Sequence, residues 1–474
     1  MKYTPEHQYR CTIIRGKSQQ DIEDMLPKYA EIVHSNCPCT KVEFVDRARR
    51  NLSMLLFGTS SFDKLSFSNQ KTVNNHLTEI AGSLLCLYYI SRDEETGIDI
   101  VYETASCKFI HEHQDNPTFF KNLCLNFQFP NGAKWKKYIE EDISNKINIK
   151  PYCYVVALLY CAQTSTQKIL LTKQEIGYYV LNNLDVLQGG IEPSVVYERI
   201  ITDRKNKIRR NKLSGSREWQ HIKEQFNWLE LSNIIESDST YVWLNSSEQA
   251  TIKLFIEQLH NIGFDAYSYS LKSSDDWKLY LRNWRRYYGG FREDLLNVRT
   301  SFATKREIAD SSEMHQQGSV IKNSIELGDE GEALVYRIEQ ERVRQYKERL
   351  VNKVLLLGKQ KGLGYDISSI EADENKEKPE FARYIEVKST QRVTEPSFSK
   401  EWVDSVNLTS KEWVAAEQYG EYYNIYRVYF TKKKTIVVRI KNPYYLNQNN
   451  KIEVFPTVFQ MNFDSSVIEK RYEE

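Results

Sequence analysis

Hydrophobic side chains recur every three or four positions in residues 68–86, which predicts an amphipathic helix with Ser68 as its N-cap. Two β-rich runs joined by a polar turn at Gly97 come directly afterwards, so a hairpin is expected. A helix followed by a hairpin is the order of a winged-helix module. Residues 1–150 are therefore predicted to form an N-terminal subdomain, with a winged helix as one interpretation.

The same order is clearer in residues 151–250, which are predicted to form a second, winged-helix-like subdomain. Thr172 and Glu175 make a capping box, in which a hydroxyl and a carboxylate satisfy backbone N–H groups at a helix start. Pro193 occupies a first-turn position of the next helix. The predicted elements are helices at 154–161, 172–181, 193–201 and 219–228, and wing strands at 231–235 and 241–244.

Residues 251–320 are predicted to form a helical connector. Tryptophans and leucines alternate there with basic residues until Gly289 and Gly290 break the pattern. Aromatic packing between domains and contact with a phosphate backbone explain this basic segment equally well.

The last part of the chain, residues 321–474, changes to an α/β pattern. An amphipathic helix opens near Gly331, and a strand at 353–357 leads to a glycine-rich turn before Asp366. Side chains alternate along a strand, so Glu386 and Lys388 in the run 383–390 project from one face. A capping box at 409–412, a helix and hairpin strands at 421–430 and 435–440 follow.

The carboxylates of this part suit metal-assisted hydrolysis of a phosphodiester. Asp366 and Glu386 supply the hard oxygen ligands that Mg²⁺ prefers, with Mn²⁺ as a substitute. Lys388 is positioned to orient or deprotonate the attacking water and to stabilise the developing negative charge. Glu332, on the preceding helix, is predicted to hold a second metal ion or its water shell.

Composition brings in charge. The chain of 474 residues has 65 Lys+Arg and 64 Asp+Glu, a net charge of +1 that argues against indiscriminate coating of nucleic acid. The charge is nevertheless segregated, because residues 199–217 are strongly basic, as a phosphate-contacting surface would be. A solvated helix end is the alternative explanation. The predicted DNA-contacting residues are Arg204, Lys205, Lys207, Arg209, Arg210, Lys212, Arg217, Arg285, Arg286 and Gln391.

The eight cysteines lack the spacing of a disulfide framework or of a paired zinc site. Cys107, His111, His113 and Cys124 are zinc-ligand types, but no C-x2-C pair accompanies them, so reduced, buried thiols and no zinc are expected. No leader-like or membrane-spanning segment is apparent, and a cytoplasmic protein is expected.

Residues 324–463 resemble the PD-(D/E)XK nuclease superfamily and, more narrowly, the C-terminal domain of protein NO VEIN that many bacterial restriction and defence proteins carry. The matching motifs are Gly331-Glu332, Gly364-Tyr365-Asp366-Ile367, Ile385-Glu386-Val387-Lys388-Ser389-Thr390, Leu408-Thr409-Ser410-Lys411-Glu412-Trp413 and Tyr426-Arg427-Val428. Gly364-Tyr365 replaces the proline of the name motif. The resemblance implies a restriction-endonuclease-like α/β domain in which Glu332, Asp366, Glu386 and Lys388 are catalytic.

The predicted architecture is thus multidomain, with an α-rich or α+β DNA-recognition region of winged-helix-like modules followed by an α/β PD-(D/E)XK domain. The favoured function is a Mg²⁺-dependent, sequence-specific endonuclease of the type II restriction kind, acting on double-stranded DNA as a homodimer during cleavage. No nucleotide-binding P-loop or methyltransferase is recognisable, so a methyltransferase would be a separate partner. A modification-dependent or other antiphage nuclease and a non-catalytic DNA-binding regulator are the alternatives.

Overall fold

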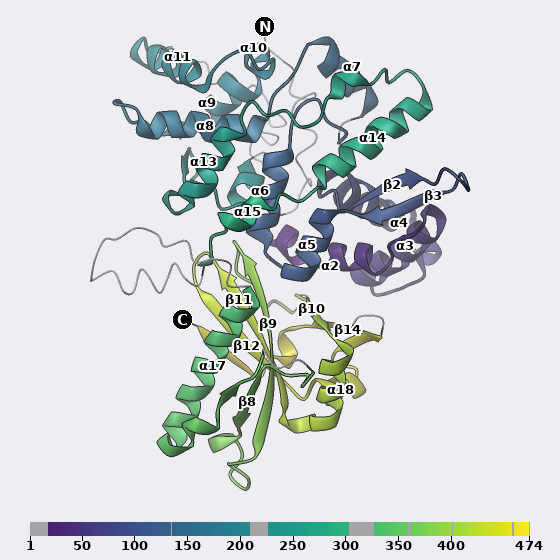
Figure 1. Cartoon of the computed structure of the whole chain (residues 1–474), viewed down its shortest axis with the longest axis vertical. Helices are drawn as coiled ribbons and strands as arrows, with labels where there is room; N and C mark the ends of the chain where they lie inside the picture. The colour runs from purple at the N-terminus through teal and green to yellow at the C-terminus, as the bar shows by residue number, and fades with distance from the viewer. Residues whose placement is uncertain are drawn as a thin grey trace. The chain divides into compact units, whose positions relative to one another are not determined.

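The computed structural model describes residues 18–133, 135–208, 226–302, 327–358, 362–400, 402–456 and 459–473 (Figure 1). The chain divides into two units, each discontinuous in sequence. The N-terminal unit comprises Met1–Gln19, Tyr29–Glu112 and Asn116–Thr300, and the C-terminal unit comprises Gln20–Lys28, His113–Asp115 and Ser301–Glu474. The protein is therefore multidomain, with a mainly helical N-terminal unit and a sheet-rich C-terminal unit.

The first part of the N-terminal unit confirms the predicted helix and hairpin. The helix is formed by α4 and continues as the π-helix η2, and the hairpin is the antiparallel pair β2 and β3. The predicted N-cap Ser68 was wrong, because the helix begins at Phe67 and the Ser66 side chain accepts the Asn69 N–H. The elements of this part of the chain are α2 (Gln19–His34), β1 (Cys39–Thr40), α3 (Lys41–Phe57), η1 (Phe62–Lys64), α4 (Phe67–Asn75), η2 (His76–Leu84), β2 (Tyr88–Arg92), β3 (Asp99–Glu103), α5 (Ala105–His113), α6 (Asn116–Asn126) and α7 (Lys136–Ser144). Gln20–Lys28 of α2 and the last residue of α5, His113, are grouped with the C-terminal unit.

The remainder of this unit contains the second predicted set of helices and a three-stranded sheet of order β4-β6-β5. Its elements are α8 (Pro151–Thr164), β4 (Leu171–Thr172), α9 (Lys173–Ile176), η3 (Gly177–Leu181), α10 (Leu184–Leu187), α11 (Pro193–Lys205), β5 (Ile235–Ser237), β6 (Tyr241–Leu244), η4 (Ser246–Glu248), α13 (Gln249–Glu257), η5 (Ala266–Ser268), α14 (Ser274–Tyr288) and α15 (Asp294–Asn297). The capping box at Thr172 and the first-turn position of Pro193 are confirmed.

Two boundaries differ from the sequence prediction. The strand expected at 231–235 was wrong, because residues 226–231 are helical and β5 begins only at Ile235, where it pairs with β6. The residues expected to form a connector include α13 and α14, which the structure groups with the N-terminal unit. There α14 buries Tyr280, Trp284 and Tyr288, so its aromatic face packs inside the unit.

The C-terminal unit is built on a six-stranded sheet of order β15-β12-β11-β9-β8-β7, in which β9 and β11 are parallel and the other neighbours antiparallel. A second sheet has the order β10-β14-β13. The elements are α17 (Leu327–Tyr346), η6 (Glu348–Lys353), β7 (Leu355–Leu356), β8 (Ile367–Ile370), η7 (Ala372–Glu374), β9 (Ala382–Arg392), β10 (Asp404–Leu408), α18 (Ser410–Tyr419), η8 (Gly420–Tyr422), β11 (Tyr423–Thr431), β12 (Thr435–Lys441), α19 (Pro443–Gln448), β13 (Glu453–Pro456), β14 (Phe459–Phe463), η9 (Ser465–Val467) and β15 (Lys470–Glu473).

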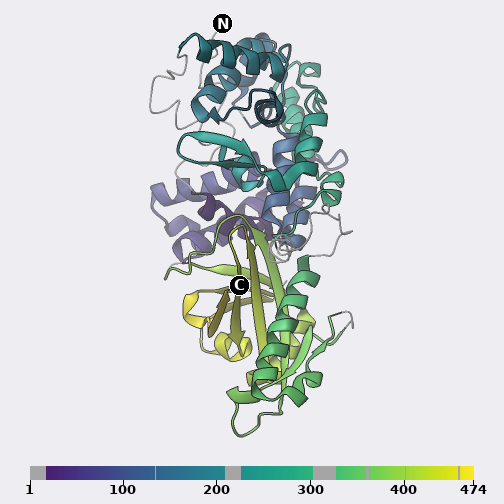
Figure 2. The ribbon, with the colours of Figure 1, turned by 90° about the vertical axis from the view of Figure 1, so that its left-hand side faces the viewer.

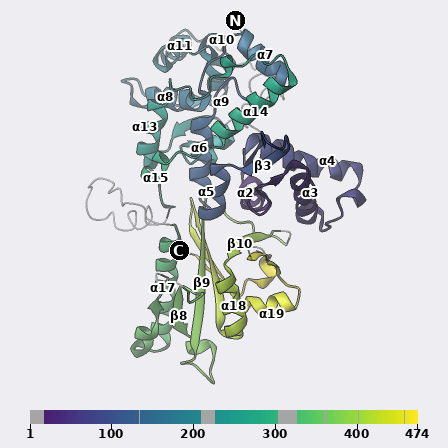
Figure 3. The same cartoon turned by 45° about the vertical axis from the view of Figure 1, so that its right-hand side comes forward.

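Helices cover both faces of the six-stranded sheet. Figures 1 and 3 show α17 on one side of β8 and β9 and α18 on the other, and Figure 2 shows α17, in green, running along the sheet. Alternation along β9 serves both layers: Ile385 and Val387 belong to the core under α17, whereas Tyr384 packs against the core under α18. The catalytic face predicted for Glu386 and Lys388 is therefore the α18 face.

Candidate active site

Asp366 and Glu386 are brought together by the register of two antiparallel strands. Ile367 of β8 pairs with Ile385 of β9, so the residue preceding β8, Asp366, lies opposite Glu386. The Asp366 backbone N–H donates to the Ile385 carbonyl at 2.8 Å, and the Asp366 carboxylate accepts a 2.8 Å hydrogen bond from the Val387 N–H. The aspartate is thus held through both its backbone and its side chain.

Lys388 lies between two carboxylates. Its Nζ is 2.7 Å from Glu386 Oε1, on the same strand, and 2.8 Å from Glu412 Oε2, on α18. The side chains of Lys388, Glu386 and Glu412 are 22%, 5% and 14% exposed, so the cluster is largely withdrawn from solvent. The structure thus joins the three predicted residues Asp366, Glu386 and Lys388 and adds Glu412.

Glu412 was not predicted as a site residue. Its two sequence signals were the capping box with Thr409, which the structure confirms, and its place in the motif Leu408-Thr409-Ser410-Lys411-Glu412-Trp413 of the nuclease resemblance. Neither signal shows that α18 packs against the face of β9 that carries Glu386 and Lys388.

The cluster shifts the proton affinity of its members. Burial raises the pKa of Asp366, opposed by the Val387 N–H and the Lys388 charge, and burial raises the pKa of Glu386 well above its usual value. Burial lowers the pKa of Lys388, but Glu386 and Glu412 outweigh it and raise that pKa overall. Lys388 is therefore a cation near neutral pH, which favours its orienting and charge-stabilising role over the role of a base.

Close packing at Gly364 determines where α18 begins. Gly364 has a φ of +77°, and a Cβ there would lie 2.6 Å from the Lys411 carbonyl oxygen and 2.8 Å from the Ala415 Cβ. Only glycine fits this approach without displacing the helix. The Tyr423 hydroxyl, at the start of β11, donates to the Gly364 carbonyl at 2.8 Å and secures the same turn.

Glu332 approaches β9 from the opposite layer. The preceding residue, Gly331, lies so close to β9 that a Cβ would meet Ser389 Oγ, on the α17 face of the strand. The Glu332 carboxylate lies beside Gly358, which follows β7. The structure therefore places Glu332 at the β7 edge, while Lys388 is bound to Glu386 and Glu412 on the α18 face.

The donor set fits a magnesium ion. Half-buried Asp366 and buried Glu386, both with raised pKa values, repel each other when ionised, and a divalent cation would relieve that repulsion. Mg²⁺ is commonly held by one or two carboxylates while keeping several waters, which matches Asp366 and Glu386. Among the residues that the structure describes, no group of three or more His, Cys, Asp or Glu side chains is arranged as a metal cage.

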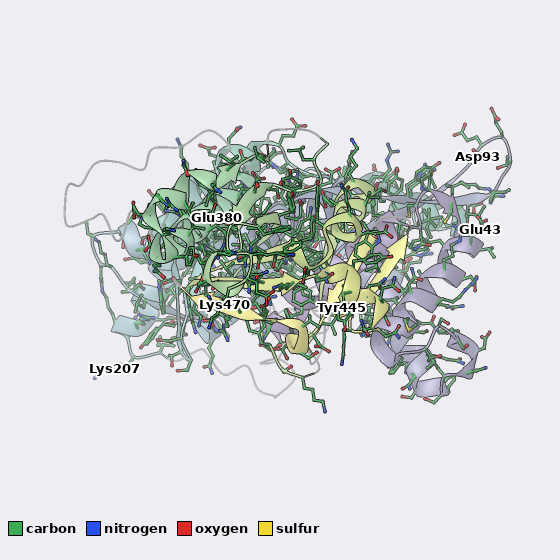
Figure 4. All side chains as sticks on the ribbon, turned by 90° about the horizontal axis from the view of Figure 1, so that it is seen from below. Glu43, Asp93, Lys207, Glu380, Tyr445 and Lys470 are labelled. Carbon is green, nitrogen blue, oxygen red and sulfur yellow. The ribbon has the colours of Figure 1, made fainter. Side chains whose placement is uncertain are left out.

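The predicted DNA-contacting residues of the 199–217 segment divide into three groups. Arg204 makes a bidentate ion pair with Glu175, with both hydrogen bonds at 2.7 Å, and so ties α11 to the start of α9. Lys205 and Lys207 are exposed, and Lys207 extends away from the ribbon in Figure 4. Arg209, Arg210, Lys212 and Arg217 lie outside the described residues.

The structure also shows the surroundings of the three remaining predicted DNA contacts, Arg285, Arg286 and Gln391. The Arg285 guanidinium lies over the Tyr88 ring and that of Arg286 over the Tyr89 ring, 5.5 and 5.9 Å from the centroids. Gln391, also predicted to contact DNA, is not exposed in this structure. It is fully buried, donates to Asp115 at 3.2 Å and accepts from the Phe302 N–H at 3.0 Å, so its amide holds the C-terminal unit together.

The comparisons with known proteins match both parts of the chain. The model for the N-terminal domain of restriction endonuclease BpuJI matches residues 3–285. This chain belongs to the BpuJI family. The model for the C-terminal domain of protein NO VEIN matches residues 331–440, which include Asp366, Glu386, Lys388 and Glu412.

A solved structure supports the N-terminal match. The BpuJ1 endonuclease binding domain, crystallised in complex with pyrene- and phenanthrene-modified DNA, is 38% identical. The alignment covers 61% of this chain and 100% of that domain, with a TM-score of 0.52. The comparison with curated proteins found no match. In the part of the chain that the structure describes, no helix is both long and apolar enough to cross a bilayer.

Proposed function

We propose that this protein is a Mg²⁺-dependent deoxyribonuclease of the type II restriction kind, in which the N-terminal unit binds a specific duplex sequence and the C-terminal unit hydrolyses the phosphodiester. The observation that carries the proposal is the cluster of half-buried Asp366 and Lys388 around buried Glu386, in one chain with a BpuJI-type N-terminal domain. The winged-helix character of the N-terminal unit and the PD-(D/E)XK character of the C-terminal unit are part of this proposal.

The roles of the residues follow from their charges. Asp366 and Glu386 would hold the magnesium ion, which supplies charge neutralisation at the phosphate and a more acidic water. Lys388, protonated and fixed by carboxylates, would orient the attacking water and stabilise the negative charge that develops on the phosphoryl oxygens. Glu332, at the β7 edge, would act on the outer water shell. One such centre cuts one strand, so duplex cleavage requires two copies of the chain.

Plasmid cleavage tests the catalytic part. Wild-type protein with Mg²⁺ or Mn²⁺ should linearise DNA at defined positions, and Glu386→Ala and Lys388→Ala should each lower the rate by at least about 10²-fold, since each removes charge stabilisation at the phosphate. Glu380→Ala, which breaks an exposed 2.7 Å ion pair with Lys353, serves as the control. Cleavage that survives both active-site substitutions would contradict the assignment.

DNA binding is tested separately, with Ca²⁺ in place of Mg²⁺. Lys205→Ala with Lys207→Ala should weaken binding to all sequences and flatten the dependence of affinity on salt, because fewer counterions are released. Unchanged affinity across a salt series would show that the end of α11 does not contact DNA.

Digestion of methylated and unmethylated DNA, with the fragment ends sequenced, would show the target sequence and reveal a modification-dependent enzyme. Binding without cleavage would instead indicate a regulator.

A further inference from the structure

The Lys388 ammonium and a bound metal ion would compete for one carboxylate. Lys388 Nζ contacts Glu386 Oε1 at 2.7 Å, and Glu386 is one of the two carboxylates available to a divalent cation. A cation at Asp366 and Glu386 repels the ammonium and draws electron density from the oxygen that it uses. The contact of Lys388 with Glu386 would therefore weaken if a divalent cation were bound.

The second contact of Lys388 does not depend on β9. Glu412 comes from α18, and its Oε2 lies 2.8 Å from Lys388 Nζ while also accepting the Thr409 N–H at 3.0 Å. Thr409 Oγ1 in turn accepts the Glu412 N–H at 3.3 Å, which completes the capping box. The carboxylate is thus fixed by its own helix start rather than by the lysine.

The first turn of α18 packs against the turn that precedes Asp366. Gly364, two residues before Asp366, leaves no room for a Cβ beside the Lys411 carbonyl oxygen, so the aspartate-bearing turn and the first turn of α18 are in contact. Glu412 therefore has a position relative to Asp366 and Lys388 that is fixed by the packing at Gly364 and by the capping box.

We propose that Glu412 is a positioning residue that keeps the Lys388 ammonium in the active site when a divalent cation occupies Asp366 and Glu386. This inference rests on the proposed function. It assigns Glu412 a role beside the metal centre without making it a metal ligand, and it separates two tasks: Glu386 for the cation and Glu412 for the lysine.

Three variants separate this role from helix capping. Glu412→Gln removes the negative charge but keeps a side-chain oxygen for the Thr409 N–H, since Gln also serves in capping boxes. Thr409→Ala removes the hydroxyl of the capping box and keeps the Glu412 charge. Glu412→Ala removes both the charge and the acceptor, and it remains informative if glutamine still accepts a hydrogen bond from Lys388.

The decisive measurement is the reactivity of Lys388 toward an acetylating reagent, followed by mass spectrometry of the full-length protein with and without Ca²⁺. With Ca²⁺, Lys388 should stay protected in the wild type and in Thr409→Ala but become readily acetylated in Glu412→Gln and Glu412→Ala. Lys353, whose partner is the exposed Glu380, should react equally in all four proteins. Equal protection of Lys388 in all four proteins would overturn the proposal.

Cleavage kinetics provide the second readout. Glu412→Gln should lower kcat about 10- to 100-fold, the usual effect of losing a residue that orients a catalytic group, with DNA affinity and the Mg²⁺ concentration for half-maximal rate unchanged. A raised Mg²⁺ requirement would show a metal ligand instead and would overturn the assignment. If the wild type cuts no DNA at all, the proposed function fails. The acetylation experiment still tests whether Glu412 holds the Lys388 ammonium.

Discussion

Arg383 of β9 and Glu374 of η7 belong to a second charged cluster, which lies on the α17 face of β9, three residues from Glu386. Arg383 is fully buried and pairs with Glu371 and Glu374, each at 3.0 Å. Arg439, on β12, reaches Glu374 at 2.8 Å. Removing one partner from such a network leaves a buried charge uncompensated, so its members depend on one another.

Glu374 should make stability depend on acid pH. Burial raises the pKa of Glu374, but hydrogen bonding and charge from Arg439 and Arg383 outweigh it and lower the pKa from 4.5 to about 2. A depressed pKa stabilises the fold when the group is ionised. The contribution, on the order of 3 kcal/mol, should be complete above about pH 4.5 and disappear as the pH falls toward 2.

Urea unfolding of the wild type and Glu374→Gln at pH 7, 5, 4 and 3 measures this contribution. The difference in unfolding free energy of the C-terminal unit should be largest at pH 7 and 5 and shrink at pH 3. A difference in unfolding free energy that stays constant over this range would show that Glu374 acts through packing.

The ion-pair partners of Arg383 were not predicted from the sequence, because Glu339 and Glu371 come from other parts of the chain.

At the scale of elements, the active site depends on how α18 meets the turn before β8. The capping box and the helix 410–419 were predicted correctly, because they depend on residues within four positions of one another. The contact of the helix start with Gly364 and Lys388 depends on the sheet order, which places β9 beside both β8 and β11. The local sequence pattern does not specify which strands are neighbours in the sheet.

Gly364→Ala should disturb this meeting point. The alanine Cβ would be 2.6 Å from the Lys411 carbonyl oxygen at a φ of +77°, so it adds a steric clash to backbone strain. We expect the C-terminal unit to lose at least about 2 kcal/mol of stability, and cleavage to fall because Glu412 and Asp366 move apart. Chemical denaturation and the plasmid assay measure the two effects.

Gly58→Ala is the control for backbone strain alone. Gly58 has a φ of +66° with open space around its Cβ position, so the cost there should be only about 1 kcal/mol and cleavage should not change. Equal effects of the two substitutions would show that the Gly364 contact is not needed to place α18.

At the scale of the whole molecule, two short upstream segments complete the C-terminal unit. Residues 20–28 of α2 and residues 113–115 belong to it, although the main part of the unit begins only at Ser301. Glu23 accepts the Val393 and Thr394 N–H groups, both at 2.8 Å, and Asp24 pairs with Arg392 at 2.6 Å. The strand that carries Glu386 and Lys388 is therefore secured at its end by the first described helix.

Glu23→Ala should destabilise the C-terminal unit by about 2–3 kcal/mol, because the part-buried Val393 and Thr394 N–H groups lose their acceptor, while Arg392 keeps its contact with Asp24. Glu380→Ala, which removes only an exposed ion pair with Lys353, should change stability by less than about 1 kcal/mol. Hydrogen exchange of residues 385–394 would locate the effect. Unchanged protection in Glu23→Ala would show that β9 is stable without the upstream segment.

The sequence by itself determined the elements and the residues proposed to carry out the chemistry. Helical periodicity, capping boxes and the alternation along β9 are local properties of the sequence. They identified α17, α18 and β9, all of which are present in the structure, and the three residues Asp366, Glu386 and Lys388, which the structure brings together. The resemblance to restriction nucleases rested on the same residues, and the family matches agree with it.

Only the tertiary structure decided which distant residues meet. Glu412 became the second partner of Lys388, Gln391 became a buried link, Arg204 was bound by Glu175, and residues 20–28 joined the C-terminal unit. Each of these pairings joins residues from different elements. Such pairings depend on sheet order and helix packing, and no local pattern of hydrophobic and polar positions specifies them.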